Sequence, residues 1–369
     1  MEMRKFLFVL PALFLCAFAH GEQYRAALVA DMNSGRVLIS ENANDANYPA
    51  SLTKIMTLYL TFDALEHGRL HLDDYLIVSQ SAANASPVKL GLPAGSKIRV
   101  EDAIMAVAVH SANDVARVLA ENLKGGKEET FASLMTRVAR EIGLSKTNFE
   151  NSSGLPDDDH LSTARDIALL SMAVYKHFPQ YWKYFGVKNW TYNGKTYTNG
   201  NRLLGTYPGC DGMKTGFTNK SKYSLVASAN RDGVRLLSVV LGAENKDVRA
   251  DVSVRLLNRG FEMLHNGATP IVKQTPVAKP APVTSPVVQK YATDAPRVGG
   301  AGVQFGAFSS RASADSMVAR IKNTLGANAH VETTDSGLYR VRVGGLSDTG
   351  ANDLKSRAIA AGIDCFVFH

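Results

Sequence analysis

The chain has 369 residues, 45% of them apolar and 20% charged, so it can bury substantial cores, and its length suggests two domains. Its 41 basic and 34 acidic residues give a formal net charge of +7, which favours an anionic partner. The three cysteines are too few for a disulfide framework, and the nine histidines show no metal-ligand spacing, so we expect no metal site.

The first nineteen residues have the layout of a secretory signal peptide. Arg4 and Lys5 precede an apolar run over 6–19 that ends in Ala-Phe-Ala, a small-x-small cleavage signal. The run is shorter than the roughly 20 residues of a membrane span, so an uncleaved anchor is the less favoured alternative. Cleavage leaves 39 basic and 33 acidic residues, a charge of +6. An exported protein of this charge suits an anionic cell-wall polymer or membrane surface, and we expect no nucleic-acid partner.

Residues 20–266 mix strand and helix patterns and are predicted to form one domain. They begin with a hairpin over 26–31 and 36–40, and they end with strands near 223–229 and 234–241 and a helix over 247–265. Between them a helix starts at Ser51, and further helices are expected near 101–109, 114–123, 130–142 and 163–176. This order predicts a sheet assembled from both ends of the domain, with a helical subdomain inserted.

A proline-rich segment separates this domain from a smaller one. Six of the chain's thirteen prolines lie between Pro270 and Pro296, with Asp294 as the only acidic residue there, so we predict an extended linker over 267–299. Residues 300–369 then follow a β-α-β-β-α-β pattern of a small α+β domain. Its expected strands lie near 303–308, 329–334, 338–343 and 365–368, and its helices near 312–325 and 349–361.

Three short motifs follow one another along the larger domain: Ser51-Leu-Thr-Lys54, Ser111-Ala-Asn113 and Lys214-Thr-Gly216. S-x-x-K also occurs at Ser86, and S-x-N also occurs at Ser40 and Ser228, whereas K-T-G occurs once. Ser86 precedes a proline in a loop without helical continuation, and the other two matches lie outside the interval from Ser51 to Lys214. The sequence context therefore favours the motifs at Ser51, Ser111 and Lys214 over the other matches.

The chosen motifs carry a coherent chemistry. Lys54 lies three residues after Ser51 on the same helical face, and as a neutral amine it can accept the hydroxyl proton. Desolvation and a nearby Lys214 lower the pKa of such a lysine. The Ser111 hydroxyl can relay a proton to a leaving amine while Asn113 holds peptide groups. Taken alone, each serine motif is more simply a helix N-cap.

The third motif suits an acidic acyl substrate. On an exposed strand, Lys214 supplies positive charge and Thr215 supplies a hydroxyl for a carboxylate. Gly216 leaves room where a substrate backbone approaches. A strand followed by a turn is the plain structural alternative for this motif.

From about residue 24 to 265 the chain resembles the low-molecular-mass penicillin-binding proteins of the D-alanyl-D-alanine carboxypeptidase type. Beyond the three motifs, the resemblance lies in Asp31-Met-Asn-Ser-Gly-Arg-Val-Leu, Pro49-Ala-Ser-Leu-Thr-Lys-Ile-Met-Thr, Asn151-Ser-Ser-Gly-Leu-Pro, Leu161-Ser-Thr-Ala-Arg-Asp and Asp211-Gly-Met-Lys-Thr-Gly-Phe-Thr. It implies an α/β catalytic domain of the β-lactamase/transpeptidase type, with an antiparallel sheet and a helical subdomain. It also implies removal of the terminal D-alanine from peptidoglycan stem pentapeptides, inhibition by β-lactam antibiotics, and no cofactor.

The same resemblance implies roles for individual residues. Ser51 is then the acylated nucleophile, Lys54 its base and Ser111 the proton relay, and the backbone N–H groups of Ser51 and Phe217 form the oxyanion hole. Arg249 matches a family arginine near the substrate carboxylate. Many relatives carry histidine where this chain has Phe217, and many continue into a β-rich domain and an amphipathic membrane helix. Here the linker replaces both, so we expect no stable membrane anchor.

The last seventy residues resemble a SPOR domain, through Gly302-Val-Gln-Phe-Gly-Ala-Phe-Ser-Ser and Leu338-Tyr-Arg-Val-Arg-Val-Gly-Gly. This resemblance implies binding of septal glycan strands stripped of stem peptides. The candidate glycan contacts are Gln304, Phe308, Arg340 and Arg342. Because side chains alternate along a strand, Tyr339, Val341 and Val343 are expected in the core and the two arginines exposed. An RNA-recognition fold shares the element order, but its aromatic motif is absent.

We therefore expect an exported, periplasmic D-Ala-D-Ala carboxypeptidase, enriched at the division septum, that acts on stem peptides and binds glycan strands. A DD-endopeptidase that cuts cross-links is the alternative within the same class. A β-lactamase is less favoured, because no dedicated deacylating glutamate is evident. A septal glycan-binding protein with a vestigial enzyme domain is the alternative from a different class.

Overall fold

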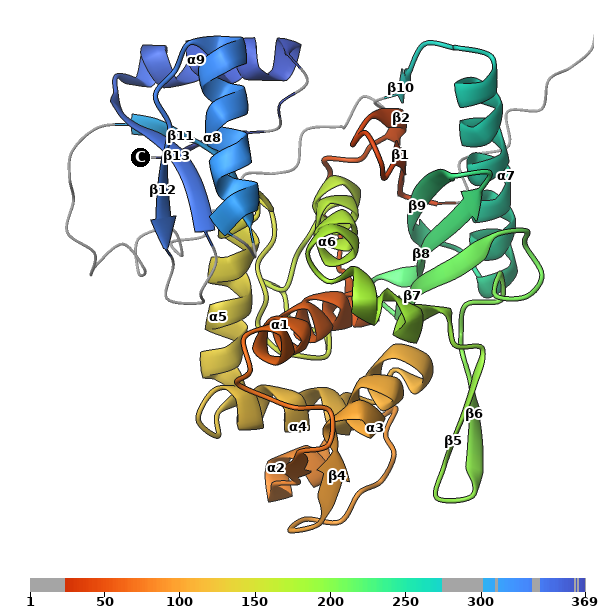
Figure 1. The fold of residues 1–369 in the computed structure, drawn as a ribbon. Helices are drawn as coiled ribbons and strands as arrows, with labels where there is room; N and C mark the ends of the chain where they lie inside the picture. Colours follow the sequence, from red (N-terminus) through yellow and green to blue (C-terminus); the bar gives the residue numbers. More distant parts are fainter. Residues whose placement is uncertain are drawn as a thin grey trace, which may run out of the picture.

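The computed structural model describes residues 24–273, 301–308, 311–333, 339–361, 363 and 365–368. The predicted signal peptide and most of the predicted linker lie outside these residues. Two bodies are seen in Figure 1: a larger one formed by residues 24–273 and a smaller one, drawn in blue, formed by the C-terminal residues. The element order within each body follows the order expected from the sequence.

The larger body is built on a six-stranded sheet with strand order β10-β2-β1-β9-β8-β7. Strands β1 to β9 of this sheet pair antiparallel, whereas β10 pairs parallel with β2. The two ends of the domain thus meet in one sheet, and the expected antiparallel sheet with an inserted helical subdomain is confirmed. The strands are β1 (Ala26–Asp31), β2 (Val37–Glu41), β7 (Cys210–Thr218), β8 (Lys222–Arg231), β9 (Val234–Ala243) and β10 (Ile271–Lys273).

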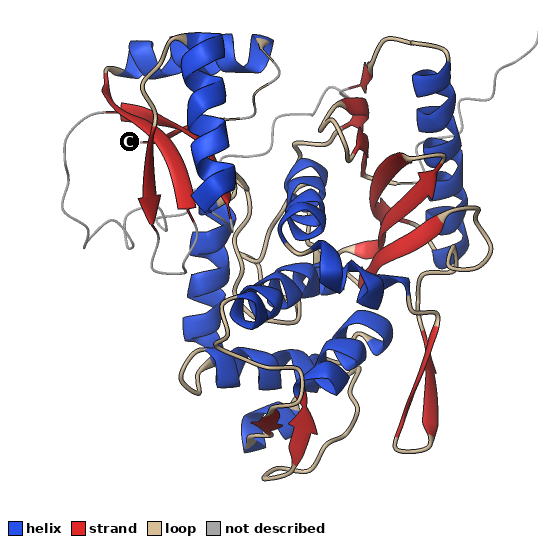
Figure 2. Cartoon of the chain, viewed as in Figure 1, coloured by secondary structure: helices blue, strands red, loops and turns tan. Residues whose placement is uncertain are grey.

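Both faces of this sheet are covered, which explains the continuous apolar runs of β8 and β9. Successive side chains alternate between two cores: Val226 and Val239 pack into the core of the helical subdomain, and Leu225 and Val240 pack beneath α7 (Lys246–His265). Helix α1 (Lys54–Glu66) is buried along nearly its whole length and forms the centre of the molecule (Figures 1 and 2). A helix buried on all sides shows no amphipathic pattern.

The helical subdomain carries the first two motifs. Its remaining elements are η1 (Ala50–Thr53), β3 (Tyr75–Ile77), α2 (Gln80–Asn84), β4 (Lys97–Arg99), α3 (Val100–Met105), η2 (Ala106–His110), α4 (Asn113–Leu123), α5 (Glu128–Glu141), α6 (Ala164–His177) and η3 (Pro179–Gly186). Between η3 and β7 the chain forms a hairpin, β5 (Asn189–Tyr192) and β6 (Lys195–Thr198), that projects from the body (Figure 2). The expected helices are confirmed, whereas this hairpin and the small strands β3 and β4 were not predicted.

The structure extends the larger domain beyond the predicted boundary at residue 266. Strand β10 ends at Lys273 and lies within the segment predicted as linker. Its pairing with β2 uses main-chain groups, including the Asn42 N–H that donates to Lys273 O at 3.1 Å, so it needs little apolar sequence. The predicted start of the linker at residue 267 is therefore too early.

The smaller body has a four-stranded sheet with strand order β12-β13-β11-β14, and the described strand pairs are antiparallel. Helices α8 and α9 pack on one face of this sheet around a core that includes Val303, Ile321 and Val341. The expected β-α-β-β-α-β domain is confirmed. Its elements are β11 (Ala301–Phe308), α8 (Arg311–Leu325), β12 (His330–Thr333), β13 (Tyr339–Leu346), α9 (Asp348–Ala360) and β14 (Phe366–Phe368).

Candidate active site

Ser51 lies in the tight turn η1, just before α1, and this turn is strained. Ala50, which precedes Ser51, has a φ of +47°, a left-handed conformation that costs a non-glycine residue about 1–2 kcal/mol. Gly154 packs directly over it, since a Cβ on Gly154 would lie 1.8 Å from the Ala50 carbonyl oxygen. Strand β7 also packs against the turn. The turn that carries the Ser51 hydroxyl is therefore held by two neighbouring segments.

Lys54 has three partners around its amine. Its Nζ lies 3.0 Å from Ser51 Oγ, 2.7 Å from Asn113 Oδ1 and 2.7 Å from the Ser153 carbonyl oxygen. A neutral amine has two hydrogens and one lone pair. If the hydrogens go to Asn113 and Ser153, which are acceptors at these atoms, the lone pair points at the Ser51 hydroxyl. This geometry suits a base that takes the proton from Ser51.

Electrostatics favour that neutral state. Burial lowers the pKa of Lys54 well below its usual value, and the positive charge of Lys214 lowers it further. Glu128 and Asp114 act in the opposite direction but more weakly. The predicted direction of the pKa shift and its two causes are thus both present.

Ser111 lies between η2 and α4 in a left-handed conformation, with a φ of +64°. Its Oγ accepts a hydrogen bond of 2.9 Å from Lys214 Nζ. Strained non-glycine residues persist where surrounding contacts hold them, and they gather at functional sites. The second and third motifs thus meet through one hydrogen bond.

Lys214 and Arg249 form a buried cationic wall. Burial, followed by the charge of Arg249, lowers the pKa of Lys214 to about 7, and burial lowers the pKa of Arg249 to about 10. The Arg249 guanidinium donates to the carbonyl oxygens of Gly200 at 3.2 Å and Ser224 at 3.4 Å. Half-buried Thr215 lies beside Gly200, where a Cβ would come within 2.8 Å of its Oγ1. An anionic group near these cations would favour their charged forms.

Gly216 and Phe217 make contacts that were not expected from the sequence. A Cβ on Gly216 would lie 3.1 Å from the Pro49 carbonyl oxygen and 3.4 Å from Ala50 Cβ, so glycine is needed for close packing of β7 on η1. The role of Gly216 toward the substrate stays a prediction. Phe217 is 47% exposed and its ring lies 4.3 Å from that of Tyr223.

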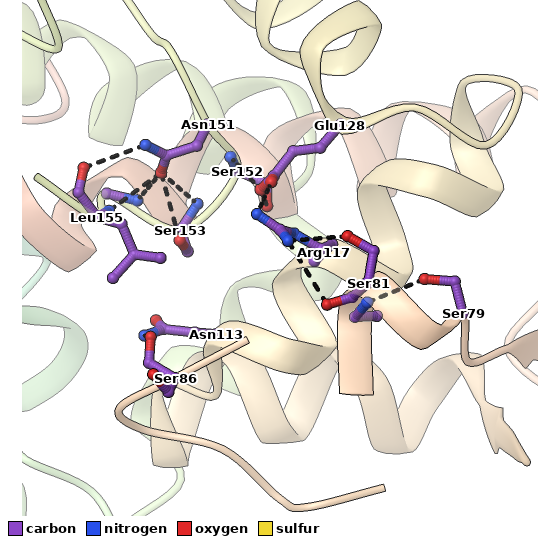
Figure 3. Close-up of polar contacts among 12 residues, drawn as sticks. Ser79, Ser81, Ser86, Asn113, Arg117, Glu128, Asn151, Ser152, Ser153 and Leu155 are labelled. Atoms are coloured by element: carbon purple, nitrogen blue, oxygen red, sulfur yellow. Dashed lines mark hydrogen bonds and ion pairs between the residues drawn. The ribbon is translucent and has the colours of Figure 1, made fainter. Parts of the chain in front are cut away.

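Asn113 is buried and holds the site together from α4. Its Nδ2 donates one hydrogen to Ser86 O at 3.0 Å, and its backbone N–H donates to Val88 O at 2.7 Å. The segment of the discarded S-x-x-K match at Ser86 therefore supplies backbone acceptors behind Asn113 (Figure 3). The contact that Ser86 makes with Asn113 uses its carbonyl oxygen.

Several residues at the site carry no catalytic motif and were not predicted. Besides the Ser153 carbonyl, His160 Nε2 bonds Thr53 Oγ1 at 2.8 Å directly behind the nucleophile turn. Asn151 Oδ1 accepts from the N–H groups of Ser153, Gly154 and Leu155 at 2.7–3.2 Å (Figure 3). The segment Asn151-Ser-Ser-Gly-Leu-Pro was part of the family resemblance, and this was the only sequence signal for it.

The candidate glycan contacts of the smaller body face the larger one. Gln304 is fully buried, and its Nε2 donates to the Glu141 carbonyl oxygen at the end of α5. Arg340 Nη1 lies 4.0 Å from Glu141 Oε1, and Lys176 Nζ lies 5.3 Å from the centre of the Phe308 ring.

Strand β13 alternates as predicted, but its polar face is not open. Val341 and Val343 are in the core, whereas Arg340 and Arg342 are only 22% and 20% exposed. Both arginines pair with Glu332, at 3.0 and 3.3 Å, and Arg342 Nε donates to Gln304 Oε1 at 2.8 Å. The expectation that they are exposed is wrong because their face lies against α5 and Glu332.

Within the described part of the chain, no group of three or more potential metal ligands is found. None of the helices in that part combines the length and the apolar character that crossing a membrane requires. In the part of the chain that the structure describes, neither Cys210 nor Cys365 forms a disulfide bond.

An antiparallel sheet packed on a helical subdomain, with the three motifs around one serine hydroxyl, defines a protein of the β-lactamase/transpeptidase class. A family model described as D-alanyl-D-alanine carboxypeptidase matches residues 20–245, and one described as SPOR domain matches residues 298–368. The first match covers more than half of the chain. The chain belongs to the D-alanyl-D-alanine carboxypeptidase family of serine peptidases, and it carries a SPOR domain at its C-terminal end.

Individual relatives agree with this assignment. D-alanyl-D-alanine carboxypeptidase DacC of Escherichia coli is 39% identical over 254 residues, covering 67% of this chain and 63% of the relative. D-alanyl-D-alanine carboxypeptidase DacF of Bacillus subtilis is 34% identical over 242 residues, covering 64% of this chain and 62% of the relative. The match thus spans a little under two thirds of the length of these relatives.

Solved structures share the fold of the larger body. Penicillin binding protein 5 from Haemophilus influenzae has a TM-score of 0.63 at 35% identity, over 65% of this chain and 71% of that protein. Penicillin-binding protein D2 from Listeria monocytogenes, solved in its ampicillin-bound form, has a TM-score of 0.60 at 32% identity. That match covers 68% of this chain and all of the D2 chain.

Proposed function

We propose that this protein is a serine D-Ala-D-Ala carboxypeptidase that removes the terminal D-alanine from peptidoglycan stem pentapeptides through an acyl-enzyme on Ser51. The observation that carries the proposal is a pair of hydrogen bonds, one between Lys54 and Ser51 and one between Lys214 and Ser111. Both lie in a domain that matches the D-alanyl-D-alanine carboxypeptidase family. β-Lactams are proposed to trap the same serine, which is supported by the ampicillin-bound relative.

In the first step, neutral Lys54 takes the Ser51 proton as Oγ attacks the carbonyl carbon of the penultimate D-alanine. The negative charge that develops on the carbonyl oxygen is proposed to meet the backbone N–H groups of Ser51 and Phe217. The C–N bond then breaks. Ser111 Oγ, which accepts from Lys214 Nζ at 2.9 Å, passes its proton to the departing amine of D-alanine. Ser111 then takes up the proton that Lys54 removed from Ser51, so Lys54 is neutral again before the second step.

In the second step, water hydrolyses the acyl-enzyme. Lys54 takes a proton from the water, and the attack on the ester carbonyl expels the Ser51 alkoxide, which regains its proton from Lys54. The products are the shortened stem peptide and the free enzyme. Each proton taken by Lys54 is thus returned within one cycle.

The terminal carboxylate of the substrate is proposed to bind at Lys214, Thr215 and Arg249. Two buried cations of lowered pKa favour an anionic group, which restores their charged forms on binding. Asn113 retains one amide hydrogen beyond its bond to Ser86 O, and we assign that hydrogen to a substrate peptide group. Exposed Phe217 then lies where relatives carry histidine and is proposed to affect substrate preference.

The domain layout suggests where the enzyme works. We propose a signal peptide over 1–19, a catalytic domain, a proline-rich linker and a glycan-binding SPOR domain over 300–369, which together direct the protein to the periplasm and the division septum. Gln304, Phe308, Arg340 and Arg342 are the proposed glycan contacts. Export and glycan binding are supported by the sequence of the N-terminus and by the SPOR match over residues 298–368.

The proposal is tested by incubating the full exported chain with pentapeptide-containing peptidoglycan and analysing the muropeptides, with Ser51→Ala as the control. Release of free D-alanine with conversion of pentapeptides to tetrapeptides by the wild type alone is the expected result. Loss of cross-linked dimers instead indicates a DD-endopeptidase. Unchanged muropeptides with retained binding to peptidoglycan indicate a glycan-binding protein, and either outcome contradicts the proposal.

A further inference from the structure

The Ser153 carbonyl that accepts a hydrogen bond from Lys54 belongs to a loop fixed from two sides. On one side, Asn151 Oδ1 gathers the N–H groups of the following turn, and its Nδ2 donates to Leu155 O at 3.1 Å. On the other side, Thr57 Oγ1, one turn after Lys54 on α1, donates to Ser152 O at 2.6 Å. The loop therefore presents successive carbonyl groups to the same face of α1.

Glu128, the first residue of α5, holds this loop from behind. Its Oε1 accepts from the backbone N–H of Ser152 at 3.0 Å and from Ser152 Oγ at 2.5 Å. Its Oε2 forms an ion pair with Arg117 of α4, which in turn donates to Ser81 Oγ at 2.9 Å (Figure 3). The Glu128 side chain is buried, and a buried carboxylate persists only where it is paired and hydrogen-bonded.

The carboxylate of Glu128 on α5 thus joins Ser152 of the loop to Arg117 of α4. We propose that Glu128 is a positioning residue for the general base: it anchors Ser152, and with it the adjacent Ser153 carbonyl, so that neutral Lys54 keeps its lone pair on the Ser51 hydroxyl. The inference rests on the proposed role of Lys54 and assigns Glu128 a part in it.

The physical reason lies in how the Lys54 amine is oriented. The amine can rotate about its last carbon–nitrogen bond, and only its two acceptors, Asn113 Oδ1 and Ser153 O, select the rotation that directs the lone pair to Ser51. If the Ser153 carbonyl moves, an N–H can face Ser51 Oγ instead, and an N–H does not accept a proton. Displacements of about 1 Å at such a site cost up to 100-fold in rate.

The charge of Glu128 also affects the pKa of Lys54, which gives a second measurable effect of its removal. The charged groups that act on Lys54 are Lys214 on β7, Glu128 on α5 and Asp114 on α4, and the two carboxylates raise the pKa of Lys54. Arg117 faces Glu128 and moderates its effect. Removing the charge of Glu128 therefore lowers the pKa of Lys54, and Lys54 then stays neutral to lower pH.

The test is the second-order rate constant for acylation by a fluorescent penicillin, measured against pH on the full exported chain. Glu128→Gln removes the charge at nearly constant volume, and Glu128→Asp keeps the charge but shortens the side chain. Glu129→Gln makes the same chemical change at the exposed neighbouring residue on α5 and is the matched control. The amount of folded protein is measured by thermal unfolding in parallel.

We expect the plateau rate constant to fall about tenfold or more in both Glu128 variants, and to stay at the wild-type value in Glu129→Gln. On the acid side, the pH at which the acylation rate constant falls to half its plateau is expected to be lower in Glu128→Gln and unchanged in Glu128→Asp. If the ion pair between Glu128 and Arg117 is purely structural, its loss changes the unfolding temperature. It then changes neither the plateau rate constant per folded molecule nor the pH at which the rate constant falls on the acid side.

Wild-type plateaus in the Glu128 variants overturn the inference, whatever their unfolding temperatures, and if Glu128→Gln does not fold, Glu128→Asp alone decides. This failure is distinct from a failure of the proposed function. In the latter case the wild type itself is not acylated at Ser51.

Discussion

His160 supports the nucleophile turn as a neutral side chain. The backbone N–H of Glu150 donates to its Nδ1 at 3.2 Å, so the ring proton lies on Nε2, which donates to Thr53 Oγ1 at 2.8 Å. Burial lowers the pKa of His160 to about 4. His177, whose Nδ1 lies 2.8 Å from the Tyr59 hydroxyl oxygen, is buried in the same way, and its pKa is also lowered to about 4.

These two histidines predict how stability depends on pH. The unfolded chain binds a proton at each histidine below about pH 6.5, whereas the folded protein does so only near pH 4, so stability is lost as pH falls through this window. The loss is on the order of 3 kcal/mol for each residue. We expect His160→Gln, which keeps a donor for Thr53, to reduce the slope of the free energy of unfolding against pH by up to about 1.4 kcal/mol per pH unit between about pH 6.5 and 4.

The measurement is urea unfolding followed by tryptophan fluorescence between pH 7.5 and 4.5, since both tryptophans of the chain, Trp182 and Trp190, lie in the larger domain. Replacing His71, which is exposed, by glutamine is the control for the substitution itself. An undiminished slope in His160→Gln contradicts the assignment of a neutral, buried His160.

At this scale the sequence predicted side chains that act chemically and missed groups that act through the backbone. Ser51 and Lys54 were predicted because a spacing of three residues on a helix brings them together. Ser153 contributes a carbonyl oxygen, which every residue has, so its residue type does not reveal the role and only the family resemblance of Asn151-Ser-Ser-Gly-Leu-Pro marks the segment. Glu128 was missed because an acidic residue in a first helical turn is most simply explained by the helix dipole.

At the scale of elements, the site depends on how closely the loop at Gly154 approaches the turn η1. Gly154 has a φ of +82°, and a Cβ there would meet the Ala50 carbonyl oxygen at 1.8 Å and Thr53 Oγ1 at 2.9 Å. An added methyl group must displace the turn that carries Ser51. The contact between Gly154 and the turn η1 could not be predicted from the order of the motifs along the sequence.

We therefore expect Gly154→Ala to lose up to about 100-fold in the penicillin acylation rate per folded molecule and to unfold at a lower urea concentration. Gly125→Ala is the matched control, because Gly125 has a φ of +70° with nothing within 4 Å of its Cβ position. That variant carries only the backbone cost of about 1–2 kcal/mol. Similar losses of acylation in both variants would show that packing of the loop on η1 is unimportant.

Strand β10 contains only three residues, and its pairing is decided by what lies beside it in the fold. The hairpin β5–β6 does carry a sequence signal: Trp190 and Tyr192 alternate with polar residues before Asn193-Gly194, a pair typical of hairpin turns. Strands β8 and β9 and helix α7 were predicted because their apolar patterns report burial directly.

At the scale of the whole molecule, the face of the SPOR sheet that carries the proposed glycan contacts lies against the end of α5 (Figure 1). A cavity of about 560 Å³ remains between the two bodies, lined in part by Phe305, Arg320 and Lys176. The side chains of the two bodies do not fill this open pocket, so their contact is less closely packed than a protein core and is expected to open at low cost.

Glycan binding through this face then competes with the contact between the domains. In Glu141→Arg, the new charge repels Arg340, which lies 4.0 Å from Glu141 in the wild type, so we expect severalfold tighter binding of the full chain to glycan strands stripped of stem peptides. Arginine suits the C-terminal turn of α5, where the helix dipole favours a positive charge.

Glu129→Arg adds the same charge at the other end of α5, where residue 129 is exposed, and it controls for nonspecific attraction to an anionic polymer. Binding is measured by cosedimentation over a range of chain concentrations. Equal affinities of the Glu141→Arg and Glu129→Arg variants would contradict competition between the two surfaces.

The central claim is that Ser51 is the acylated nucleophile, and peptide mapping by mass spectrometry after incubation with a penicillin tests it most directly. We expect a single penicilloyl adduct on the peptide that contains Ser51, and none in Ser51→Ala. An adduct on another residue, or an equal adduct in Ser51→Ala, would contradict the claim.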